Sequence, residues 1–73
     1  MQTELVYELY DACMTAIEDR NRARERAEEL QNRASVYAEK LDLFLTDSVR
    51  EELSDDITSR MDFLIKMVMR GLI

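Results

Sequence analysis

The chain has 73 residues, of which 16 are acidic and 10 are basic, so its net charge is −6 at neutral pH. It contains no His, Pro or Trp, and it has one Gly and one Cys. Without His it lacks the most common general base and zinc ligand, and a single Cys can form neither an internal disulfide nor a thiolate metal site. We therefore expect one small domain over residues 1–73, with no catalytic residues, no metal and no cofactor.

A single uninterrupted helix is predicted for the first part of the chain. No Pro or Gly lies between Thr3 and Thr46, and apolar or small residues recur there at alternating spacings of three and four, the heptad pattern of a coiled coil. Arg20 is the one polar exception. The pattern predicts a helix over about residues 3–46, and we call its heptad positions the seam. The seam consists of Val6, Leu9, Cys13, Ala16, Arg20, Ala23, Ala27, Leu30, Ala34, Tyr37, Leu41 and Phe44.

A second, shorter helix is predicted over about residues 48–70, after a turn near residues 46–48. Ser48, followed three residues later by Glu51, has the form of a capping box that marks a helix start. Ser54 could instead cap a separate helix, so this segment could hold one helix or two. The lone glycine near the end of the chain predicts the C-terminal end of the helix, in the position where a left-handed residue closes a Schellman motif.

A hairpin of these two helices would leave much of the first one uncovered. At about 1.5 Å per residue the first helix would be about 65 Å long and the second at most about 35 Å long. The apolar face of the N-terminal half would be bare, which is unusual for a soluble monomer. We therefore expect a second copy of the chain to cover it.

The seam favours an antiparallel dimer. A parallel pair would bury Arg20 against its own copy, which places two like charges together. In an antiparallel pair centred near residue 25, Val6 meets Phe44 and Cys13 meets Tyr37, while small residues meet in the middle. The expected fold is all-α: a helical hairpin that dimerises into an antiparallel four-helix bundle or coiled coil.

Acidic side chains are concentrated at the N-terminal end of the sequence. Residues 1–19 carry five acidic side chains and no basic one. Such a surface repels nucleic acid and anionic lipid, and it attracts a basic protein surface. No apolar run reaches the roughly 18 residues of a membrane-spanning helix, and no signal-like basic start is present. We expect a cytoplasmic protein whose partner is a larger protein with a basic surface, without direct contacts to nucleic acid or membrane.

Several apolar side chains fall on helix faces that should be polar. Tyr7 and Met14 lie one heptad apart on such a face, and Phe63 and Met67 lie beside the polar face of the second helix. Aromatic and Met side chains are favoured in protein interfaces, and an acidic rim would suit a basic groove. The predicted partner-binding residues are Glu4, Tyr7, Glu8, Tyr10, Asp11, Met14, Phe63 and Met67.

Two other patterns point to different functions. The four arginines within residues 20–26 are similar to the basic region of a leucine-zipper factor, but neighbouring acids cancel their charge and the run lies inside the seam. Glu25 and Glu28, followed by Glu52 and Asp55, resemble the bare outline of the all-α nucleotide pyrophosphatases, which hold magnesium between carboxylates. A magnesium-dependent pyrophosphatase is therefore a remote alternative.

The leading hypothesis is a non-enzymatic protein-binding regulator or inhibitor. In size, acidity and helical design the chain is similar to phage host-takeover proteins, anti-CRISPR proteins and anti-activators, which bind and block a larger protein. Such a protein would occlude a functional surface of its partner, for example a nucleic-acid-binding one. The alternative is a structural coiled-coil adaptor or assembly protein.

Overall fold

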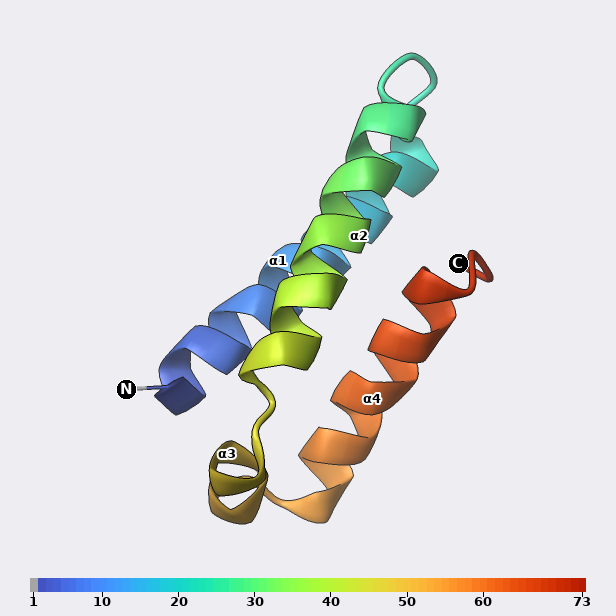
Figure 1. Cartoon of the computed structure of the whole chain (residues 1–73). Coiled ribbons are helices and arrows are strands. Elements are labelled where there is room, and N and C mark those ends of the chain that lie inside the picture. Colours follow the sequence, from blue (N-terminus) through green and yellow to red (C-terminus); the bar gives the residue numbers. More distant parts are fainter. Residues whose placement is uncertain (1) are drawn as a thin grey trace.

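The structure is a computed structural model and describes residues 2–73, which measure 40 × 22 × 17 Å. Within these residues α-helix is the only regular secondary structure, which confirms the predicted all-α class. The first two helices form an antiparallel hairpin, the third turns the chain, and the last packs along the hairpin (Figure 1). The helices are α1 (Gln2–Arg22), α2 (Ala27–Phe44), α3 (Asp47–Glu52) and α4 (Asp55–Met69).

The predicted single helix over residues 3–46 is wrong, because the chain reverses direction at residues 23–26. Helix α1 then runs beside α2 (Figure 1), so each covers the apolar face of the other. No Gly or Pro forces this reversal. Its physical reason is burial: closing a short loop costs little entropy, whereas each Val or Leu removed from water contributes roughly 1.5–3 kcal/mol.

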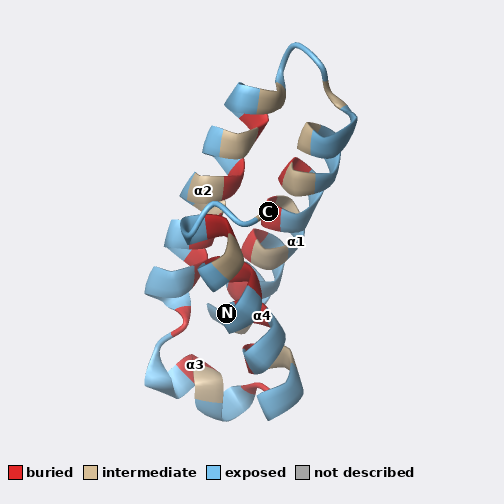
Figure 2. Ribbon diagram, turned by 90° about the vertical axis from the view of Figure 1, so that its right-hand side faces the viewer, coloured by how far each residue is buried: buried red, intermediate tan, exposed pale blue. Residues whose placement is uncertain are grey.

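The core lies where α1, α2 and α4 face one another, as the buried residues in Figure 2 show. One cluster joins the open end of the hairpin to α3 and α4, and the other joins the middle of the hairpin to the C-terminal half of α4. The first cluster is Val6, Leu9, Leu41, Leu45, Val49, Leu53, Met61 and Ile65. The second is Cys13, Ala16, Ala34, Ala38, Leu64 and Val68.

Most of the seam is buried within one chain. The buried seam residues are Val6, Leu9, Cys13, Ala16, Leu30, Ala34 and Leu41. Arg20, Ala23, Ala27 and Tyr37 are half-buried, and Phe44 is 38 % exposed. The bare face that suggested a dimer is therefore covered by the chain's own helices, and the dimer itself stays a prediction.

Two hydroxyl side chains set the starts of the short helices. The N-cap of α3 is Thr46, whose hydroxyl accepts a hydrogen bond from the Val49 amide at 3.4 Å. The capping box predicted at Ser48 is therefore wrong by two residues. Ser54 caps α4 as proposed, accepting from the Ile57 amide at 3.3 Å, so the segment after residue 46 holds two helices.

The end of α4 is the Schellman motif that the sequence predicts. Gly71 has a φ of +69°, the left-handed conformation that glycine adopts without strain. The Leu72 amide donates to the Met67 carbonyl at 2.9 Å, and the Gly71 amide donates to the Val68 carbonyl at 3.0 Å. These are the two hydrogen bonds that define the motif.

Arg50 of α3 ties the end of α2 to α4. Its Nε donates to the Leu45 carbonyl at 3.1 Å, and its two Nη atoms donate to the Asp62 carboxylate at 2.7 and 2.8 Å. These bonds lower the pKa of Asp62 and raise that of Arg50. A two-pronged arrangement of this kind fixes orientation as well as distance, so it holds the turn between α2 and α4 in one geometry.

Candidate functional site

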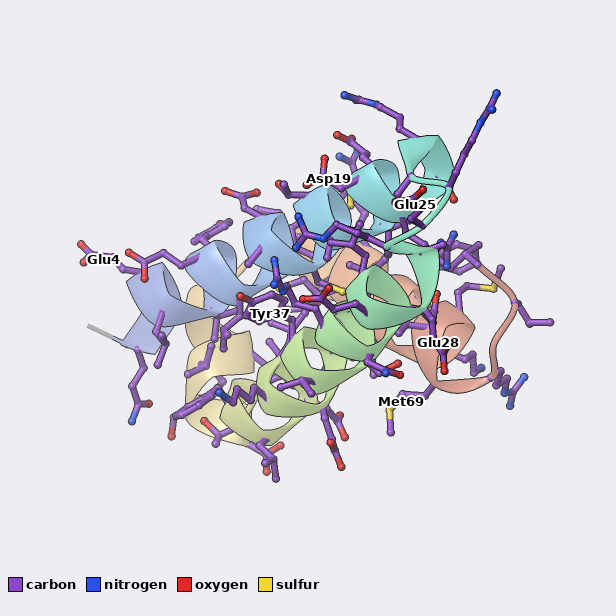
Figure 3. The ribbon with its side chains drawn as sticks, turned by 90° about the horizontal axis from the view of Figure 1, so that it is seen from above. Glu4, Asp19, Glu25, Glu28, Tyr37 and Met69 are labelled. Atoms are coloured by element: carbon purple, nitrogen blue, oxygen red, sulfur yellow. The ribbon has the colours of Figure 1, made fainter. Side chains whose placement is uncertain are left out.

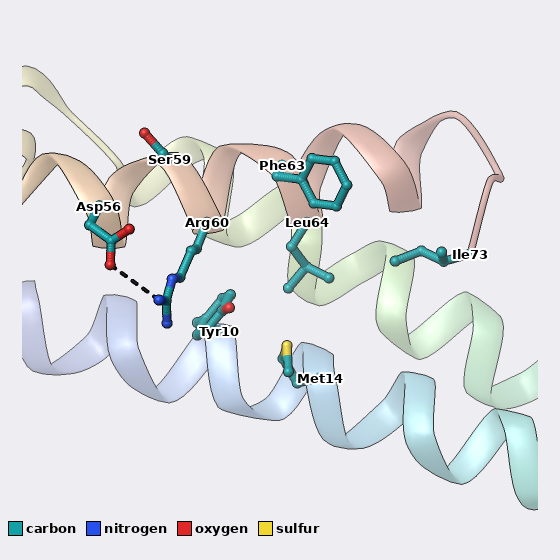
Figure 4. A pocket seen from close by; sticks show the side chains of 8 residues that line it. All are labelled: Tyr10, Met14, Asp56, Ser59, Arg60, Phe63, Leu64 and Ile73. Atoms are coloured by element: carbon teal, nitrogen blue, oxygen red, sulfur yellow. Dashed lines mark ion pairs between the residues drawn. The ribbon is translucent and has the colours of Figure 1, made fainter.

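An apolar groove lies between α1 and α4, because α4 packs more closely against α2 than against α1. Its wider part has a volume of about 380 Å³. In Figure 4, Met14 of α1 and Phe63 of α4 lie on opposite sides of it, and Leu64 lies between them. Its lining residues are Tyr10, Met14, Asp56, Ser59, Arg60, Phe63, Leu64 and Ile73.

A second, narrower part continues the groove toward the start of α1. It has a volume of about 260 Å³ and shares Tyr10 and Arg60 with the wider part. Its lining residues are Tyr7, Tyr10, Asp11, Ile57, Arg60 and Met61. We call the two parts together the α1–α4 groove. A channel of this size accommodates a few large apolar side chains in a row.

An acidic stripe borders the groove on α1. Glu4, Asp11 and Glu18 recur at intervals of seven residues, so they lie on one line along the helix. That line is adjacent to the one that carries Tyr7 and Met14. Glu4 and Asp11 form no ion pair with the described residues, whereas Glu18 lies 3.8 Å from Arg22. Two carboxylates beside the groove are thus free to meet a cation from a partner.

One ion pair lies along the opposite rim of the groove, on α4. Arg60 approaches Asp56 to 3.3 Å, one helical turn away on α4 (Figure 4). Both side chains are about 70 % exposed, at 70 and 73 %. An ion pair so open to water contributes only tenths of a kcal/mol and breaks readily. Arg60 can therefore move aside, or leave Asp56 to a cation from a partner.

The groove brings together most of the predicted partner-binding residues. Tyr10, Met14 and Phe63 line its wider part, and Tyr7 and Asp11 line the narrower part. Three others lie outside the lining: Glu4 belongs to the acidic stripe, Glu8 is exposed further round α1, and Met67 is half-buried.

Sequence reasoning missed part of the lining. Leu64 is not among the predicted partner-binding residues; it is only 6 % exposed, yet it forms the floor of the groove. The sequence did not indicate that Ile73 and Arg60 line the groove, because their positions there depend on how α4 packs relative to α1. One sequence feature could have indicated that α4 supplies a second apolar side of the groove. Ile57 and Leu64 lie seven residues apart, and Phe63 is adjacent to Leu64.

Cys13 has no features of a reactive thiol. It is fully buried, and its sulfur lies 3.4 Å from the Ala34 carbonyl oxygen. Burial raises the pKa of the Cys13 thiol from 9.0 to about 11, because the thiolate is less well solvated inside the protein. Cys13 is therefore a small core residue at the contact between α1 and α2.

The carboxylates of the pyrophosphatase-like pattern do not converge. Glu25 and Glu28 flank the start of α2 at the closed end of the hairpin, whereas Glu52 and Asp55 lie at the junction of α3 and α4, at the other end of the molecule (Figure 1). Figure 3 shows Glu25 at the end of the hairpin opposite Glu4. Across residues 2–73 no three acidic or cysteine side chains gather as a metal site would require. The pattern therefore describes no single site.

No helix of residues 2–73 combines the length and apolar character needed to cross a membrane. Comparison of the chain with models of protein families, with curated proteins and with solved structures found no match.

Proposed function

We propose that the protein is a non-enzymatic binding protein that takes up a basic, amphipathic segment of a larger protein in the α1–α4 groove. The observation that supports this most directly is the coincidence of an apolar groove with an adjacent acidic stripe. Phe63, Tyr7 and Met14 are 63, 40 and 39 % exposed although they are large and apolar. Apolar side chains of the partner would occupy the groove, and its basic side chains would meet Glu4 and Asp11.

Charge favours a basic partner over an acidic or neutral one. The net charge of −6 attracts a basic surface at long range and raises the association rate. At short range, the free carboxylates of Glu4 and Asp11 would form ion pairs that are partly shielded from water by the bound segment. Apolar contact supplies most of the affinity, and charge supplies selectivity.

Binding of this kind would act by occlusion. A segment held in the groove would have its apolar and basic side chains covered, so it could not bind another macromolecule through them. A basic amphipathic segment is a common element of surfaces that contact nucleic acid or other proteins. Inhibition or regulation of the partner is the expected consequence.

The test compares matched variants in a capture experiment from the source cell. The groove variant carries Met14→Ser and Phe63→Ser, whereas the control variant carries Val36→Ser and Leu43→Ser on the outer face of α2, where the side chains are 47 and 74 % exposed. The proposal requires a protein that the unmodified chain and the control variant retain and that the groove variant loses. Retention of the same proteins by all three would contradict it, as would retention of none.

A charge variant separates a binding protein from a purely structural coiled coil. Replacing Glu4 and Asp11 by Lys reverses the acidic stripe while leaving the seam untouched. A binding protein should lose its partner and keep its helical content, measured by circular dichroism. A structural adaptor that makes its contacts through the seam should keep both its partners and its helical content.

A further inference from the structure

The loop that closes the hairpin lacks the residues that normally make helix–helix turns. Residues 23–26 are Ala, Arg, Glu and Arg, all good helix formers. The loop contains no Gly, Asn, Asp, Ser or Pro, the types that stabilise turns. Arg26 is the N-cap of α2 but makes no side-chain capping bond. The loop sequence is therefore as compatible with a continuous helix as with a turn.

Helical hydrogen bonds reach both sides of the loop. The Ala23 amide donates to the Asp19 carbonyl at 2.9 Å, which continues the hydrogen-bond pattern of α1, and the Leu30 amide donates to the Arg26 carbonyl at 2.9 Å. Only residues 23–26 thus lie between the two helices. The seam continues in phase across the loop, since Arg20, Ala23 and Ala27 keep the spacing of three and four.

The contacts between α1 and α2 pair residues in antiparallel order about the loop. Cys13 contacts Ala34, and Arg20 donates a hydrogen bond to Gln31, so the paired residue numbers sum to 47 and 51 and place the centre at about residue 24. An antiparallel pair of continuous helices centred at about residue 24, one residue from the centre that the seam predicts, would bring the same residues together. Each contact that one chain makes with itself could therefore be made with a second copy.

From these observations we propose that the protein also forms a domain-swapped homodimer, in which α1 and α2 of each chain join into one helix. In this dimer α1 of one chain packs on α2 of the other, and contacts such as Cys13 with Ala34 are preserved between chains. Because α3 and α4 follow α2 along the chain, α4 also packs against the α1 of the other copy. The proposal depends on the loop and the seam, and it holds whatever the α1–α4 groove binds.

The swap has a consequence for the groove. Tyr10 and Met14 of one copy would face Phe63 and Leu64 of the other, so each groove would be built from two chains. The dimer would present two such grooves at the two ends of a continuous helix pair. A partner with two binding segments could then occupy both, which raises its overall affinity without any new type of contact.

Protein concentration sets the balance between the two forms. A short loop holds α1 and α2 together at an effective concentration on the order of 1 mM. The dimer gains helical structure over residues 23–26 in both chains, which lowers the concentration at which it forms. We expect dimer to be the major species at about 1 mM and monomer to be the major species at about 10 µM.

The first experiment traps the partner of each α1 covalently. Because Cys13 is the single cysteine, an Ala34→Cys substitution provides one possible disulfide partner for it at a close contact. Oxidation at about 10 µM should give a disulfide within one chain, and oxidation at about 1 mM should give disulfide-linked dimers on a non-reducing gel. Disulfides exclusively within one chain at both concentrations would overturn the proposal.

The second experiment uses the unmodified protein and a loop variant. Light scattering should give the dimer mass for the unmodified chain at high concentration. Insertion of Gly-Ser-Gly-Ser-Gly between Arg24 and Glu25 should raise the concentration at half-dimerisation at least tenfold, because three glycines oppose a continuous helix while a longer loop is tolerated in the hairpin. A dimer that survives this insertion would be a side-by-side dimer, which would overturn the swap, as would a monomer at all concentrations.

Discussion

Removal of the Arg50 side-chain charge tests how α3 holds the fold together. Arg50→Met keeps most of the aliphatic stem but deletes the bonds to Asp62 and to the Leu45 carbonyl. The side chains of Arg50 and Asp62 are 34 and 49 % exposed, so the interaction lies between the buried and the surface case. Buried hydrogen bonds to charged groups contribute roughly 1.5–3 kcal/mol and exposed ion pairs roughly 0.2–1 kcal/mol. We expect a loss of about 1–2 kcal/mol in the free energy of unfolding.

The pH dependence of that loss identifies its source. The bond to Arg50 holds the pKa of Asp62 below its ordinary value of 3.8, which applies in the unfolded chain. A carboxyl whose pKa is lowered on folding stabilises the fold above the ordinary value and loses this contribution as the pH falls below it. The difference between the unmodified chain and Arg50→Met should therefore be largest at neutral pH and shrink at about pH 2.5.

Urea unfolding followed by circular dichroism measures both effects. Arg60→Met is the matched control, since its ion pair with Asp56 joins two side chains of 70 and 73 % exposure on the same helix. That pair should contribute only about 0.3–0.5 kcal/mol. The reasoning is refuted if the two substitutions cost the same, or if the cost of Arg50→Met does not change with pH.

Three further predictions concern the core and the end of α4. Cys13 should not react with a thiol reagent in the folded protein, and a reaction rate independent of urea would contradict its burial. Because burial raises the pKa of Cys13 from 9.0 to about 11, its contribution to the free energy of unfolding should decline as the pH rises above 9.0. Gly71→Ala should cost about 1 kcal/mol by urea unfolding, since its φ is +69°, and Gly71→Asn should cost less. Leu41→Ala should cost about 2–5 kcal/mol because Leu41 is fully buried, whereas Leu43→Ala, at 74 % exposure, should cost less than about 0.5 kcal/mol; equal losses would refute the assignment of the core.

The parts of the fold that depend on local sequence could be predicted from it. The all-α class follows from helix formers and a period of three and four residues, and the end of α4 follows from the single glycine of the chain. The cap at Ser54 was one of two alternatives that the sequence left open, since its hydroxyl precedes an acidic first turn. The start of α3 was misplaced, because Thr46 and Ser48 are both cap-forming residues and only the backbone conformation of Thr46 decides between them.

The reversal of the chain at residues 23–26 could not be predicted from local sequence. That stretch has no turn-forming residue, so its conformation depends on the burial of side chains far away, such as Val6 against Leu41. A heptad pattern indicates which side chains meet across an interface, but it does not indicate whether those side chains belong to one chain or to two. The shape of the α1–α4 groove lay beyond prediction for a similar reason, since it depends on how far α4 stands from α1.

The first half of α1 carries acidic side chains at helical spacing with no basic side chain among them. Glu4 and Glu8 are four residues apart, and Glu8 and Asp11 are three apart, so both pairs repel by tenths of a kcal/mol. In α4, by contrast, Asp56 lies beside Arg60 at the same spacing. A base at position 8 would turn both repulsions into attractions, so these three acids are better explained by binding than by helix stability. Glu8→Lys should therefore raise the free energy of unfolding by about 1 kcal/mol and slow association with a basic partner; a loss of stability, or an unchanged association rate, would contradict this division of roles.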